Sequence, residues 1–237
     1  MIDILHTIAI WFLLFITYAF LGWLMEMIIT VVIRHRFYNR GFLIGPLCPI
    51  YGVAGALITI MIGRQENILE IFCVVMIFGA AIEYLTSYLM EKLFHARWWD
   101  YTDQPFNVNG RICLGALLGF GALGVVVVKL ISPFMLSIFN RLDKIGLIFI
   151  AAALMVILIC DFIASLRLII HFRATTKTVS GDITEELTEY IRLKFAQHGK
   201  LNRRLLKAFP AMKVKKPTPR KRTKKTSAKS GQKTRSN

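Results

Sequence analysis

Five long apolar runs follow one another along the first 170 residues of this chain. They cover residues 8–33, 44–62, 68–90, 112–131 and 145–170. An α-helix needs about 20 apolar residues to cross the roughly 30 Å hydrocarbon layer of a bilayer. A soluble core does not require apolar segments of this length in immediate succession. The sequence therefore predicts an all-α, polytopic membrane helix bundle with five transmembrane helices. The lipid bilayer that surrounds this bundle is the first partner that we expect.

Charge divides the chain unevenly. Residues 1–170 carry 11 Lys and Arg against 10 Asp and Glu, whereas residues 171–237 carry 19 against 4. We therefore expect a transmembrane domain over 1–170, a cytoplasmic amphipathic helical segment over 171–209 and a disordered polybasic tail over 210–237. In the helical segment, Asp182 and Glu185 have the spacing of a capping box.

The last 28 residues include 11 Lys and Arg and no acidic residue. With so little apolar surface to bury, they are not expected to fold alone. Such a tail attracts anionic lipid, which makes lipid the favoured partner. Nucleic acid is a weaker candidate because the tail lacks aromatic residues on which bases could stack. A tail that is solvated and only fixes the topology is the simplest alternative.

Basic residues in short loops predict the orientation, since loops rich in Lys and Arg stay in the cytoplasm. Without the tail, six lie on one expected side, namely Arg34, Arg36, Arg40, Lys92, Arg97 and Arg111, against four on the other. The basic C-terminus joins the larger group. We therefore expect the N-terminus outside and the C-terminus in the cytoplasm.

Three carboxylic acids interrupt the apolar runs, and charges at membrane depth need a partner or a wet cavity. Glu26, Glu83 and Asp161 lie at similar distances from the expected cytoplasmic ends of their spans. Arg40 and Arg111 stand at the inner ends of the second and fourth spans. One hypothesis is a polar cavity in the cytoplasmic half of the bundle. The alternative is a set of structural ion pairs that hold the helices together.

Two neighbouring segments add polar groups to this region. Glu83, Ser87 and Glu91 recur every four residues, so one polar face of their helix should look into the bundle. The loop over residues 95–110 holds Trp98, Trp99 and Tyr101, whose expected role is to anchor the chain at the membrane interface. Its Asp100, Asn107 and Asn109 favour a second possibility, a loop that folds back toward the cavity.

Several short motifs occur in a distinctive order along the chain. They are Gly22-Trp23 with Glu26, Asn39-Arg40-Gly41-Phe42, Gly45-Pro46 through Tyr51-Gly52, Glu83-Tyr84 with Glu91, Trp99-Asp100-Tyr101, and Asn109-Gly110-Arg111-Ile112-Cys113-Leu114. Together they resemble the bacterial family named putative ABC-transporter type IV, the CmpB-like permeases, over roughly residues 10–130. The resemblance implies a multi-pass protein of the bacterial inner membrane that acts as a transporter permease, with an unknown substrate.

The expected cavity combines the charged residues with those of the family pattern. Its ten members are Glu26, Asn39, Arg40, Tyr51, Glu83, Glu91, Asp100, Asn109, Arg111 and Asp161. We expect no cofactor and no metal. The four cysteines are too scattered for a metal motif, and the five histidines supply no recognisable ligand set.

A permease of this kind would need a separate ATPase subunit, because no phosphate-binding loop of the G-x-x-x-x-G-K-[ST] type occurs in these residues. Five spans also favour a homodimer or another membrane partner. Two other classes stay open. One is an intramembrane enzyme or lipid-handling protein with Glu83 or Asp161 as general base, although no catalytic constellation is visible. The other is a scaffold that recruits partners through its basic tail.

Overall fold

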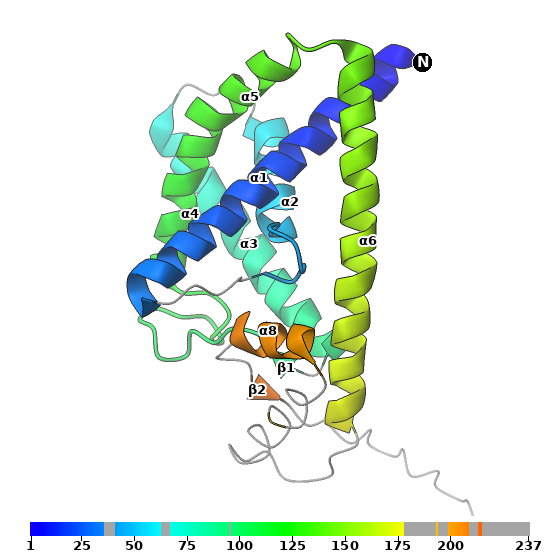
Figure 1. Ribbon diagram of the computed structural model, residues 1–237. Coiled ribbons are helices and arrows are strands. Elements are labelled where there is room, and N and C mark those ends of the chain that lie inside the picture. Colours follow the sequence, from blue (N-terminus) through cyan, green and yellow to red (C-terminus); the bar gives the residue numbers. More distant parts are fainter. Residues whose placement is uncertain are drawn as a thin grey trace, which may run out of the picture.

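The structure is a computed structural model of the chain (Figure 1). The residues that it describes are 1–35, 41–62, 67–94, 96–177, 193, 199–208 and 213–214.

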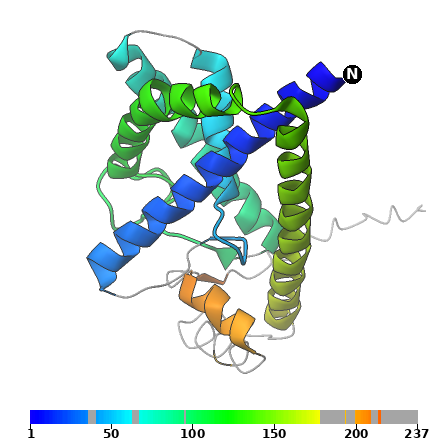
Figure 2. The ribbon, with the colours of Figure 1, turned by 45° about the horizontal axis from the view of Figure 1, so that its top comes forward.

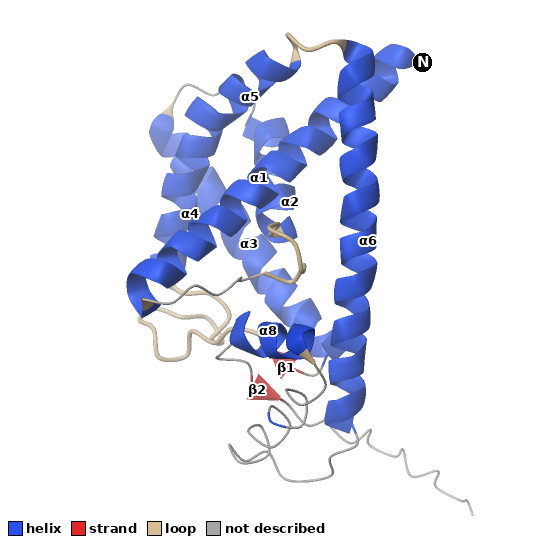
Figure 3. Ribbon diagram, viewed as in Figure 1, coloured by secondary structure: helices blue, strands red, loops and turns tan. Residues whose placement is uncertain are grey.

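The described chain is helical apart from one pair of two-residue strands (Figure 3). Its elements, in chain order, are α1 (Ile2–Arg34), α2 (Pro49–Ile62), α3 (Ile68–Phe94), β1 (Ala96–Arg97), α4 (Leu114–Val126), the π-helical η1 (Val127–Ile131), α5 (Ser132–Phe139), α6 (Lys144–Lys177), α8 (Lys200–Ala208) and β2 (Lys213–Val214). The all-α prediction is confirmed.

Within the residues that the structure describes, four helices are long and apolar enough to cross a membrane. They are Ile2–Val32, Ile68–Leu93, Leu114–Phe139 and Lys144–Ile170. The third of these runs without a break through α4, η1 and α5, so it extends eight residues beyond the predicted end at residue 131. The irregular turn of η1 lies just before Pro133, whose missing N–H prevents a regular helical hydrogen bond there.

The second predicted span is shorter as a helix than its apolar run. Only the 14 residues Pro49–Ile62 are helical, and at 1.5 Å per residue they extend about 21 Å. Residues 41–48 are irregular, because Pro46 and Pro49 cannot donate to a helical ladder and disfavour helix in the residue before them. Pro49 itself occupies the first helical position, where its missing N–H is harmless.

Helices α1 and α2 pack together, as do α3 and α4, and α6 crosses α1 near the N-terminal end of α1 (Figures 1 and 2). One apolar cluster joins α2, α3 and η1 through Ile58, Ile71 and Val128. A second joins α1 to α6 through Leu13 and Leu147. These contacts leave the outward faces of the helices apolar, as expected for helices that face lipid.

The two ends of the bundle differ. The N-terminus lies at one end, and α8 lies at the other with the loop that connects α3 to α4 (Figures 1 and 2). We call this second end the loop end, defined by residues 96–113 and α8. At the loop end, β1 and β2 pair antiparallel, with Ala96 opposite Val214 and Arg97 opposite Lys213.

Two described residues of the predicted tail lie at the loop end. Lys213 and Val214 belong to the tail expected to lack structure, yet their backbone pairs with β1, an interaction that needs no apolar core. The structure describes only part of the predicted amphipathic segment. The described part comprises residues 171–177, which end α6, the single residues 193 and 199, and the helix α8. Gly199 precedes α8 with a φ of 129°. The proposed capping box at Asp182 and Glu185 lies outside the described residues.

The contact between α1 and α2 depends on glycine. A β-carbon at Gly22 would lie 2.4 Å from the Cβ of Tyr51, so only glycine permits this approach. We predict that Gly22→Ala lowers the free energy of unfolding by about 1–3 kcal/mol, the usual cost of overpacking. Thermal unfolding of the purified protein in detergent measures this change.

Gly119→Ala is the matched control, because no described heavy atom outside its own helix and chain neighbours lies within 4 Å of the position of its β-carbon. An equal loss of stability in both variants, or none in Gly22→Ala, would contradict the role assigned to this contact.

Candidate functional site

Glu26 and Tyr51 link α1 to α2. The Tyr51 hydroxyl donates a hydrogen bond of 2.7 Å to Oε1 of Glu26. Tyr51 lies in the first turn of α2, so its position is set by the irregular segment that precedes the helix. Both residues belong to the family pattern, Glu26 was also expected from its charge, and the structure brings them together.

Glu83 lies on the inward face of α3. Its side chain is buried, with 7% of the residue exposed, and Ser87 one turn further on is 4% exposed. The predicted polar face of this helix is therefore confirmed. The Tyr101 hydroxyl donates to Oε1 of Glu83 over 3.1 Å. The other carboxylate oxygen, Oε2, is also buried and has no hydrogen-bond partner in the described part of the chain.

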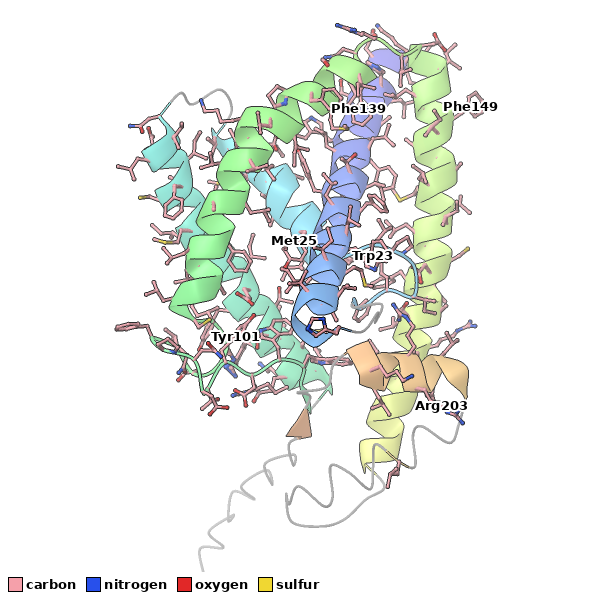
Figure 4. The ribbon with its side chains drawn as sticks, turned by 60° about the vertical axis from the view of Figure 1, so that its left-hand side comes forward. Trp23, Met25, Tyr101, Phe139, Phe149 and Arg203 are labelled. Carbon is pink, nitrogen blue, oxygen red and sulfur yellow. The ribbon has the colours of Figure 1, made fainter. Side chains whose placement is uncertain are left out.

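Tyr101 connects the two carboxylic acids electrostatically. Burial raises the pKa of its hydroxyl, and the negative charges of Glu83 and Glu26 raise that pKa further. The hydroxyl therefore keeps its proton and acts as a donor. Because both carboxylates act on it and Tyr51 binds Glu26, residues from α1, α2, α3 and the loop form one group, which we call the acid–tyrosine cluster: Glu26, Tyr51, Glu83 and Tyr101. Figure 4 shows Tyr101 at the loop end of the bundle.

A second group surrounds Arg111 at the start of α4. Its Nη2 lies 2.9 Å from Oε2 of Glu91, and both side chains are nearly buried. The guanidinium also stands over the rings of Tyr84 and Tyr88, at 5.3 and 5.5 Å from their centroids. Cation–π contacts of this kind favour a positive charge in partly dehydrated surroundings.

Arg97 completes this second group, although it was not among the predicted site residues. Its Nε lies 3.3 Å from Oε2 of Glu91, and its Nη1 lies 3.4 Å from Oδ1 of Asp100. We call Glu91, Arg97, Asp100 and Arg111 the arginine network. In the sequence, Arg97 appeared only as a loop charge that fixes orientation. The sequence signal that could have identified Arg97 was its place between two acidic residues of the expected site, Glu91 and Asp100.

The loop between α3 and α4 folds back over the bundle. Trp98 is only 2% exposed, and Nε1 of Trp99 donates 3.2 Å to the carbonyl of Arg111. The expectation that Trp98, Trp99 and Tyr101 are interface anchors is therefore wrong, and the folded-back alternative is correct. Two of these rings have polar partners within the protein, since the Tyr101 hydroxyl donates to Glu83 of α3 and the Trp99 indole donates to the carbonyl of Arg111.

A tight turn holds this loop in shape. The N–H of Tyr101 donates to the carbonyl of Gly110 over 2.8 Å, and the N–H of Gly110 donates to Oδ1 of Asn107 over 3.0 Å. Gly110 has a φ of 65°, and a β-carbon there would lie 2.6 Å from Oδ1 of Asp100. Asn109 reaches α3, where its Nδ2 donates 3.0 Å to the Tyr84 hydroxyl.

Asp161 has a different role from the one predicted. It accepts the backbone N–H groups of Ile44 and Gly45, each over 2.9 Å, in the irregular segment before α2. The buried Ser165 hydroxyl donates to Asp161 over 3.2 Å and accepts the N–H of Ile44 over 3.0 Å. A β-carbon at Gly45 would lie 2.8 Å from Oδ2 of Asp161, so glycine is required. Asp161 thus supports backbone of the irregular segment, a role that the expected polar cavity did not include.

Arg204 of α8 contacts the same irregular segment. Its Nη2 donates to the carbonyl of Leu43. Burial lowers the pKa of this guanidinium, while the charge of Asp161 acts in the opposite direction. Asn202 and Leu206 of α8 are buried as well. No sequence signal pointed to Arg204, which appeared as one of many basic residues in an amphipathic pattern.

Eight of the ten predicted site residues lie in the described part of the chain. Three of these eight, Glu26, Tyr51 and Glu83, belong to the acid–tyrosine cluster. Three more, Glu91, Asp100 and Arg111, belong to the arginine network. Asn109 and Asp161 make the separate contacts given above. Asn39 and Arg40 lie outside the described residues. Within that described part, no three His, Cys, Asp or Glu side chains come together as a metal site.

The fold defines the class of protein: four long apolar helices make the chain a multi-pass membrane protein. The chain belongs to the family described as Putative ABC-transporter type IV, whose model matches residues 13–166. The match covers α1 to α6 and with them both groups of the site, but it excludes α8 and the tail. No curated protein and no solved structure matches the chain.

The support that Asp161 gives to the irregular segment can be tested through Cys48, which is buried. In Asp161→Asn, one carboxylate oxygen becomes an amide donor, so one of the two backbone N–H groups loses its acceptor. We predict that a maleimide modifies Cys48 about tenfold faster, since losing a charged hydrogen bond costs about 1.5 kcal/mol or more. The measurement uses a variant in which Cys48 is the single cysteine.

Asp143→Asn is a matched control, because Asp143 accepts the N–H of Gly146 over 2.9 Å at an exposed helix start. It should leave the reactivity of Cys48 unchanged. An unchanged rate in Asp161→Asn would show that other contacts hold residues 41–48 in place.

The arginine network should show strong coupling between its charges. Arg111→Gln leaves Glu91 with fewer partners in a nearly buried position, and we predict a loss of about 3 kcal/mol in stability. Glu91→Gln in the same chain should recover part of that loss. A double-mutant cycle followed by thermal unfolding in detergent should give a coupling energy of about 1–3 kcal/mol.

The Asp3–Lys144 pair serves as the control, since both of its side chains are largely exposed. The same cycle there should give negligible coupling, because exposed pairs contribute little. Additive losses for Arg111 and Glu91 would contradict the network.

Proposed function

We propose that this chain is the membrane-embedded permease subunit of a transporter, with its polar site in the cytoplasmic half of the bundle. The observation that carries the proposal is the buried Glu83 on a membrane-crossing helix, near a second, partly buried carboxylic acid and an arginine network. Charges at this depth cost several kcal/mol to place, so a chain that keeps them commonly uses them. Membership of the ABC-transporter type IV family supports transport as that use.

The proposal includes five crossings of the membrane. Helix α2 is too short alone, but residues 41–48 extend it, and several of their backbone N–H groups have acceptors within the protein. Asp161 and Ser165 accept the N–H groups of Ile44 and Gly45, and the carbonyl of Ala19 in α1 accepts the N–H of Cys48 over 2.9 Å. Irregular backbone is tolerated at membrane depth when it is packed in this way.

The loop end would face the cytoplasm and the N-terminus the outside of a bacterial inner membrane. The distribution of Lys and Arg between the two ends supports this orientation. The transmembrane domain would then be followed by a cytoplasmic helical segment and by a tail that binds anionic lipid. A small bundle of this kind would act as a homodimer or with other membrane subunits.

ATP hydrolysis would be supplied by a separate subunit. The test is to purify the tagged chain from its native membranes in a mild detergent and identify the proteins that accompany it. We expect a protein with a phosphate-binding loop at a fixed molar ratio. In the purified complex, Glu83→Gln and Arg111→Gln should each lower ATPase activity about tenfold or more, because the first removes the ionisable group of the site and the second removes a charged hydrogen bond in nearly buried surroundings.

Glu70→Gln is the control variant, since Glu70 lies on the same helix but is exposed in its first turn. It should keep full activity. The proposal fails if no ATPase accompanies the chain, or if the site variants assemble normally and retain full activity.

A further inference from the structure

Glu83 has one carboxylate oxygen that the structure leaves without a partner. Oε1 accepts the Tyr101 hydroxyl over 3.1 Å, whereas Oε2 is buried and accepts nothing from the described residues. The residue as a whole is 7% exposed. Buried polar atoms are nearly always hydrogen-bonded, so an orphaned carboxylate oxygen indicates a missing ligand or a different charge state.

The charged groups that surround Glu83 do not neutralise it. From α1, Glu26 presents a second negative charge within electrostatic range. From α2, Tyr51 is engaged with Glu26, and from the loop Tyr101 supplies one neutral hydroxyl. Cys113, at the start of α4, also lies within electrostatic range of Tyr101.

The nearby cations are committed elsewhere. Arg111 is paired with Glu91, and Arg97 is paired with Glu91 and Asp100. No described cation forms an ion pair with Glu83. An ionised Glu83 would therefore be opposed both by burial and by repulsion from Glu26, with a single hydrogen bond in its favour.

Glu91 provides an internal comparison on the same face of α3. It lies eight residues further along, at a similar orientation, but it has two arginines within 3.3 Å. The face thus carries one carboxylic acid with charge partners and one without. The first is suited to be ionised, and the second is not.

We propose that Glu83 binds a proton and stands as a neutral carboxylic acid at neutral pH. The proton is bound at Oε2, the oxygen without a partner, while Oε1 continues to accept the Tyr101 hydroxyl. Release of this proton leaves a carboxylate facing Glu26, so proton release is favoured only when a cation or water reaches the site. The inference extends the proposed transport function by naming the proton as a ligand of its site, although the proton site itself requires no transport.

Infrared difference spectroscopy tests the proposal on the full-length chain in detergent at neutral pH. The spectrum of wild type minus Glu83→Gln should contain the carbonyl stretch of one protonated carboxylic acid per chain, shifted to lower frequency in D₂O. Wild type minus Glu91→Gln is the matched control, and it should contain carboxylate bands instead. Glu83→Asp should keep a carboxylic acid band at an altered frequency.

Carboxylate bands alone in wild type minus Glu83→Gln would overturn the proposal. A carboxylic acid band that appears in Arg40→Ala and is absent from wild type would also overturn it, because Arg40 would then neutralise an ionised Glu83. If Glu83→Gln does not fold, wild type carrying ¹³C-carboxyl glutamate replaces it. In that sample, one carboxylic acid band should be present at neutral pH and disappear as the pH is raised, and its absence at neutral pH would overturn the proposal.

The outcome is independent of the ATPase experiment. A protonated Glu83 without an accompanying ATPase would retain the proton site and reject the permease function. An ionised Glu83 in a complex with ATPase activity would reject the proton site and retain the permease function.

Discussion

Backbone groups that leave the helical ladder must find partners wherever water is excluded, and in this chain one carboxylic acid meets most of that need. Asp161 accepts two successive N–H groups of the segment before α2, and the adjacent Ser165 shares one of them. The segment ends where Cys48 donates to Ala19, near the middle of α1. This anchoring fixes where α2 begins, and therefore where Tyr51 meets Glu26. The position of the acid–tyrosine cluster thus depends on Asp161, which lies in α6 and is not a member of the cluster.

Charge within the bundle is separated into two environments rather than balanced uniformly. In the arginine network, two arginines face two carboxylates, and the ring faces of Tyr84 and Tyr88 lie against one guanidinium. In the acid–tyrosine cluster, each of two carboxylic acids accepts a tyrosine hydroxyl, Glu26 from Tyr51 and Glu83 from Tyr101. The loop between α3 and α4 supplies residues to both, Tyr101 to one and Asp100 with Arg97 to the other. A shift of this loop would therefore change both environments together.

The sequence indicated most of the fold and much of the site, for identifiable reasons. Apolar runs and charges at membrane depth are strong signals, so the long helices and the buried positions of Glu83 and Glu91 were predictable. Partner choice was not, because it depends on contacts between distant segments: Asp161 was expected near Arg111 but binds backbone beside Gly45. The aromatic residues of the loop were misassigned because their composition also suits an interface anchor. No local sequence pattern indicated the contact of Arg204 with the irregular segment or the strand pairing of Lys213.

Arg97 belongs to two structures at once. Its backbone forms the strand that pairs with Lys213, and its side chain bridges Glu91 and Asp100. The C-terminal region is therefore mechanically connected to an ion pair of the bundle by a single residue, without any intervening helix. Any binding event that draws β2 away from β1 frees the backbone of Arg97 from its strand pairing, and thereby loosens the hold of its side chain on the nearly buried carboxylate of Glu91.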